Sequence, residues 1–116
     1  MSTTTTTANA ITANHLLTGG LIVTSTSTAA LNGTYKCDGH MFSALQAEAD
    51  SLALNNGTFV DGSTSVNWPD WSGASHTFTE AQFRTLINAI NLFVVQCAQY
   101  AAGITSTPPL NTATIP

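Results

Sequence analysis

The sequence predicts an α+β domain in which two helices pack on a small antiparallel sheet, with an extended arm at each end. Three observations support this class. Apolar residues recur at helical spacing in residues 39–54 and 80–102. Short runs with strand-like alternation lie between turn sequences. Both ends of the 116-residue chain are rich in Thr, Ser or Pro and lack a sustained period, so they leave room for one domain at most.

The N-terminal arm is expected over residues 1–30. Its opening, MSTTTTTANAITANHLLTGG, is Thr-rich and nearly uncharged, which is typical of an extended or flexible segment. The run LIVTSTST that follows has strand preference, so a strand is predicted near residues 21–28. At the other end, residues 104–116 contain three prolines and are expected to form an extended C-terminal tail.

The α+β domain is expected over residues 31–103 and begins with a short strand near Thr34–Cys37. Asp38 is expected to cap a helix over Gly39–Leu54, which has apolar residues at helical spacing. Gly57 is suited to the left-handed conformation that ends such a helix.

Two short strands are predicted next, around Thr58–Val60 and Ser65–Trp68. The second is expected to pair with Ser75–Phe78, because the stretch PDWSGA between them is rich in turn formers. The motif WPDWSGASHTF therefore predicts a β-hairpin.

A second helix is predicted over Glu80–Ala102, where it ends at a glycine. Thr79 and Gln82 have the spacing of a capping box, and Phe78 and Phe83 have that of a hydrophobic staple. Because the middle of this helix is apolar around more than the ~100° expected of a surface helix, strands or another subunit should cover its second side.

The composition excludes several classes of partner. Charged residues make up 7% of the chain, and the net charge is −4 with two cations, which argues against nucleic-acid and anionic-membrane binding. The longest apolar run, LFVV, is far shorter than the ~20 residues that span a bilayer. No Lys or Arg precedes Lys36, so the basic segment that begins a secretory signal is missing. We therefore expect a protein made in the cytoplasm, with much of its surface covered by assembly.

Three groups of apolar residues are predicted to contact partners. The first group is two residues of the second helix, away from the centre of its apolar stripe. The second is three residues of the N-terminal strand, which is expected to pair with a neighbouring subunit. The third is the two tryptophans beside the hairpin turn, where both are structural or one stands exposed to contact a protein or a sugar. The residues are Leu92 and Val95, then Leu21, Ile22 and Val23, then Trp68 and Trp71.

The cysteines, Cys37 and Cys97, allow one disulfide or two buried free thiols, and synthesis in the cytosol favours the thiols. Together with His40 and His76 they would form a four-ligand zinc set. Only Cys37 and His40 have ligand-like spacing, so no metal is expected.

Paired carboxylates are the remaining chemical candidate. Asp61 and Asp70, with His76 as a base, would be the groups for hydrolysis. Both aspartates occur in turn sequences, however, where Asp bonds to its own backbone. The chain contains no nucleophile elbow or phosphate loop. We expect no enzyme and no cofactor.

Four features occur in a fixed order over about residues 29–100. They are an N-G-T-Y opening, an Ala-rich helix, a hairpin motif, and an aromatic-capped helix. In these features the chain resembles a small domain of unknown function that recurs in tail and tail-fibre proteins of tailed bacteriophages. The features lie at Asn32–Tyr35, at Gly39–Leu54, at Trp68, Asp70, Gly73, His76 and Phe78, and from Phe83 onward.

This resemblance implies a virion structural protein of the tail, tail fibre or baseplate. Its expected location is the virion, and its expected partners are other virion proteins and copies of itself, as in a homo-oligomer. A capsid decoration or head-fibre protein is the close alternative. A function of another class, a host-surface carbohydrate-binding module, would use an exposed tryptophan with Asp70.

Overall fold

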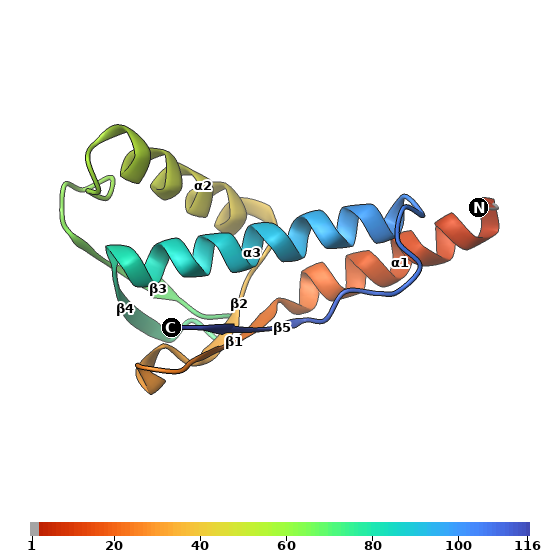
Figure 1. Cartoon of the computed structure of the whole chain (residues 1–116), viewed down its shortest axis with the longest axis horizontal. Coiled ribbons are helices and arrows are strands. Elements are labelled where there is room, and N and C mark those ends of the chain that lie inside the picture. Colours follow the sequence, from red (N-terminus) through yellow and green to blue (C-terminus); the bar gives the residue numbers. More distant parts are fainter. Residues whose placement is uncertain (1–2) are drawn as a thin grey trace.

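The computed structural model describes residues 3–116, with side chains from residue 5 onward. This part of the chain is an elongated α+β fold of 49 × 29 × 22 Å (Figure 1). In chain order its elements are α1 (Thr3–Gly19), β1 (Leu21–Ser25), the 3-10 turn η1 (Ala29–Leu31), β2 (Gly33–Tyr35), α2 (Gly39–Leu54), β3 (Ser65–Pro69), β4 (Ser75–Thr79), α3 (Glu80–Ala101) and β5 (Thr112–Ile115).

Helix α3 is the longest element, and its 22 residues span about 33 Å. The predicted capping box is confirmed. The hydroxyl of Thr79 accepts from the Gln82 backbone N–H at 3.3 Å, and the Gln82 side chain accepts from the Thr79 N–H at 2.9 Å. At the other end Gly103 has φ of 79°, and the Ile104 N–H donates to the Gln99 carbonyl at 2.9 Å. A left-handed glycine therefore ends this helix.

Phe83 is the centre of the aromatic core. Its ring lies 5.1 Å from that of Trp68, 5.5 Å from Phe59 and 5.6 Å from Phe78, each in an edge-to-face arrangement. Phe78 and Phe83 form the predicted staple. The two strands of the predicted hairpin, β3 and β4, pair antiparallel with Trp68 opposite His76. The hairpin is therefore held to α3 through aromatic rings from both of its strands.

Helix α2 has the predicted bounds, but the side chain of Asp38 makes no capping hydrogen bond. Gly39 enters the helix with φ of 62°, which differs from an ordinary helix start. Gly57, with φ of 85°, ends the helix as predicted, and its N–H donates to Leu52 at 3.1 Å. Arg84 of α3 joins the two helices because it also donates to the Leu52 carbonyl, at 3.3 Å.

The N-terminal strand was expected to serve neighbours, but β1 is the central strand of a three-stranded sheet with order β2-β1-β5. It pairs antiparallel with β2 and parallel with β5, so the sheet is mixed instead of antiparallel. The third sheet strand comes from the C-terminal tail, which folds back onto the domain. Residues 58–60 form no strand.

Residues 3–19 form the helix α1 instead of an extended arm, which corrects the sequence prediction for this part of residues 1–30. Residues 1–2 lie outside the described part of the chain. Local preference is weak here because Thr is a poor helix former. Packing accounts for the helix: α1 runs antiparallel beside the C-terminal half of α3, where Ala13 is buried and Asn9 donates to the Tyr100 carbonyl at 3.0 Å (Figure 1).

We predict that Phe83→Ala lowers the free energy of unfolding by about 3–5 kcal/mol, because it removes the ring that three other aromatic rings contact. Chemical denaturation measures this change. Thr79→Ala, which removes the cap at the start of the same helix, should cost about 1 kcal/mol. An equal cost for the two variants would contradict the central place of Phe83.

Candidate functional site

The turn of the hairpin is organised by Asp70. Its Oδ1 accepts from the backbone N–H groups of Ser72 at 2.9 Å and Ala74 at 3.0 Å and from the Ser72 hydroxyl at 2.6 Å. Its Oδ2 lies 2.8 Å from Nε2 of His76. These contacts hold the pKa of Asp70 well below its usual value, with the His76 bond as the largest cause. Asp70 is therefore an ionised structural group with both carboxylate oxygens engaged in hydrogen bonds.

His76 is positioned as an imidazolium. Its Nε2 faces the Asp70 carboxylate, and its Nδ1 lies 2.7 Å from the Ala30 carbonyl of η1. Both neighbours are acceptors, so both ring nitrogens must carry a proton. These bonds raise the pKa of His76, with Asp70 as the first cause. An imidazolium with both nitrogens protonated has no lone pair to accept another proton, so His76 is poorly suited to act as a general base.

Trp71 fastens this turn to the rest of the fold. Its backbone N–H donates to the Thr34 carbonyl of β2 at 2.6 Å, and its indole N–H donates to the Thr18 carbonyl near the end of α1 at 3.1 Å. The Lys36 ammonium lies 5.0 Å from the ring centroid. Gly20 is required beside the ring, because a Cβ there would lie 2.7 Å from the Tyr35 carbonyl oxygen. Trp71 thus holds the hairpin turn, β2 and the end of α1 together.

The two tryptophans have different environments. Trp68 is buried against Phe83, whereas 49% of Trp71 is exposed. A shallow depression beside Trp71 is lined by Lys36, His40, Met41 and the turn residues. Of the two tryptophans, Trp71 alone could contact a partner. Its indole N–H already donates to Thr18, and the Lys36 ammonium already lies over its ring.

The other chemical candidates are not assembled into a site. Asp61 accepts from the backbone and hydroxyl of Ser63, which lowers its pKa as in a structural turn. Cys37 and Cys97 are free and buried, and burial raises the pKa of the Cys37 thiol to about 12. Within residues 3–116, no three His, Cys, Asp or Glu side chains are grouped as metal ligands. The described helices include none long and apolar enough to cross a membrane.

The predicted N-terminal contact residues belong mostly to the core. Leu21 and Val23 are buried under the sheet, and only Ile22 faces outward. Because β1 has hydrogen-bonded neighbours on both sides, it offers no edge to another subunit. Strand addition through β1, as the sequence predicts it, does not fit this topology.

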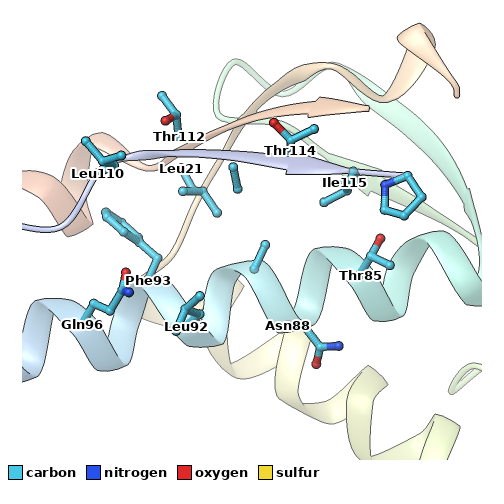
Figure 2. Close-up of a pocket in the computed structure, with 13 residues that line it drawn as sticks. Leu21, Thr85, Asn88, Leu92, Phe93, Gln96, Leu110, Thr112, Thr114 and Ile115 are labelled. Carbon is cyan, nitrogen blue, oxygen red and sulfur yellow. The ribbon is translucent and has the colours of Figure 1, made fainter. Parts of the chain in front are cut away.

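The predicted residues on α3 are at the surface. Leu92 is 59% exposed and Val95 is 51% exposed, one helical turn apart. Beside Leu92 a groove of about 390 Å³, lined by no Asp, Glu, Lys or Arg side chain, runs between α3 and β5 (Figure 2). We call this the α3–β5 groove. Its apolar lining comes from Leu21, Ala89, Leu92, Phe93, Leu110, Ala113 and Ile115.

Charge is distributed very unevenly along the chain. Every Asp, Glu, Lys and Arg lies within residues 36–84, and none occurs in residues 1–35 or 85–116. We call the described part of these outer segments, residues 3–35 and 85–116, the charge-free half. It contains α1, the three-stranded sheet, most of α3 and the C-terminal tail. Leu92, Val95 and the α3–β5 groove all belong to this half.

The α3–β5 groove was missed by sequence reasoning. It depends on β5, which returns from the tail to pair with β1. The only local signal was the alternation in TATI before the last proline, which lies in a segment that otherwise lacks a pattern.

Comparison of the chain with protein-family models, with curated proteins and with solved structures found no match in any of the three.

We predict that the His76–Asp70 pair stabilises the fold between about pH 4 and pH 6.5. The folded pKa of His76 is raised above 6.5, so its contribution is complete below pH 6.5 and is lost as pH rises through the folded pKa. The folded pKa of Asp70 is lowered below 3.8, so its contribution is present above pH 3.8 and is lost on acidification. Unfolding free energy measured against pH tests both limbs.

His76→Gln should flatten the decline above pH 6.5, since it removes the titrating group. Asp61→Asn is the matched control, because Asp61 is held in a similar turn without a histidine. It should keep the alkaline decline. An unchanged decline in His76→Gln would contradict the imidazolium assignment.

Proposed function

We propose that this chain is a structural component of a bacteriophage particle, in the tail, tail fibre or baseplate, which assembles with copies of itself and other virion proteins through its charge-free half. The observation that carries the proposal is the confinement of every Asp, Glu, Lys and Arg to residues 36–84. The phage location rests on the family resemblance of the motifs between residues 29 and 100.

The physical basis is the cost of burying charge. An ion pair or a lone charge loses hydration when another protein covers it, and the cores of protein interfaces are depleted in charged residues. The charge-free half can be covered without that cost. It also exposes Leu92 and Val95 on one face of α3, beside the α3–β5 groove. These features favour a surface that is covered in the working protein.

Carbohydrate binding is the second candidate, and the half-exposed Trp71 is the observation in its favour. A sugar would have to stack on a ring that already has the Lys36 ammonium 5.0 Å from its centroid. Asp70, the expected hydrogen-bonding partner, has both oxygens engaged within the turn. Assembly is therefore the better-supported function.

We predict that the double variant Leu92→Glu, Val95→Glu weakens self-association at least roughly tenfold, because each interface would have to desolvate added carboxylates. Sedimentation velocity over a concentration series measures the change. Both side chains are exposed in the single chain, so the fold should be retained. In phage particles carrying this variant, mass spectrometry should find less of the protein than in wild-type particles.

The matched control is Ala47→Glu, Ala53→Glu, which adds the same charge to exposed positions of α2. It should associate like the wild type. If both variants behave alike, net charge would be responsible and the charge-free half would not be the interface. Absence of the wild-type protein from purified particles would contradict the virion assignment. Antibody labelling of particles would separate a tail location from capsid decoration.

A further inference from the structure

We propose that two copies of the chain pair through the outer edge of β5, antiparallel and around a twofold axis, so that their sheets become one continuous sheet. The inference rests on the proposed assembly function and specifies its contact. It depends on a separate observation, the open edge of a strand that the C-terminal tail adds to the sheet.

The direction of the β5 backbone groups follows from its pairing with β1. The carbonyls of Asn111 and Ile115 accept from β1 or the residue after it, through Ile22 N–H at 2.8 Å and Thr26 N–H at 2.9 Å. Backbone groups alternate in direction along a strand. Thr112 and Thr114 therefore direct their N–H and C=O groups away from β1, at the outer edge of the sheet.

Apart from the four-residue length of β5 and the proline that follows it, this edge has none of the usual protections against pairing. Natural edge strands carry Lys, Pro or inward-pointing charges, or are covered by another element. Within the TATI sequence of β5 there is neither a charge nor a proline. The α3–β5 groove lies along the strand, so a strand added at this edge would also cover apolar residues such as Leu92 and Leu110.

The charge distribution favours a second copy as the occupant. The segment with residues 36–84 holds six acidic and two basic residues, so contacts between two copies there would bring carboxylates together. The β5 edge and the groove belong to the charge-free half and meet their own copies without like-charge repulsion. A twofold axis places the same surface on both sides of the contact, as isologous dimers require.

The outward-pointing backbone groups of β5 also define the register between the two copies. Because Thr112 and Thr114 direct their groups outward, the antiparallel register that satisfies all of these groups pairs Thr112 of one copy with Thr114 of the other, and each pair exchanges both backbone bonds. The axis then passes beside Ala113, whose small side chain permits the close approach of the non-hydrogen-bonded position. The side chains of Thr112 and Thr114 are exposed and share one face of the sheet.

This register allows a charge-exchange experiment on the full chain. Thr112→Lys, Thr114→Lys and Thr112→Glu, Thr114→Glu each place like charges directly opposite one another across the axis. Each variant alone should therefore associate at least roughly tenfold more weakly than the wild type. An equimolar mixture should form heterodimers, detected by native mass spectrometry. Thr112→Lys, Thr114→Glu is the matched control, since opposite charges then face each other, and it should dimerise alone.

The outcomes separate the inference from the proposed function. If the Lys and Glu variants associate alone as well as the wild type, while Leu92→Glu, Val95→Glu dissociates, β5 pairing is wrong and assembly through the charge-free half stands. If the wild type remains monomeric into the millimolar range, both self-association proposals fall. Circular dichroism should show unchanged folds, because the substituted side chains are exposed; loss of the fold would overturn the placement of these threonines.

Discussion

The fold depends on covering the apolar surface of α3. A helix of this length with apolar residues around most of its girth cannot remain folded in water alone, so every other element packs on it or on elements that do. The aromatic hairpin and α2 cover its N-terminal half, the sheet covers its middle, and α1 covers its C-terminal half (Figure 1). Leu92 and Val95 are what these elements leave exposed.

Sequence reasoning succeeded where the determining contacts are local. The bounds of α2, the hairpin and the capping box at Thr79 follow from periodicity, turn formers and caps within a few residues of each element. It failed for α1 and β5, because both form through contacts with distant segments. A Thr-rich stretch becomes helical beside Tyr100, and the tail becomes a strand beside β1. Neither partner is visible in the local pattern.

The candidate contact residues also divide into those that the local sequence predicts and those that depend on distant segments. The apolar excess on α3 was predictable from helical geometry, and both Leu92 and Val95 are exposed. Trp68 and Trp71 could not be told apart by sequence, because proline at position 69 changes the chain direction between them; the structure buries one and leaves the other half-exposed. Leu21 and Val23 read as contact residues in the sequence, yet they alternate inward beneath the sheet. The α3–β5 groove could not be predicted from the sequence, because predicting it requires the strand order of the sheet.

If the proposed assembly is right, the charge-free half is covered when copies of the chain meet. Hydrogen exchange of the full-length protein, followed by mass spectrometry at low and high protein concentration, tests it most directly. We expect the added protection at high concentration to fall on peptides from residues 88–116, while residues 58–76 exchange equally in both samples. Added protection confined to residues 36–84 would contradict it, as would exchange that is independent of concentration throughout.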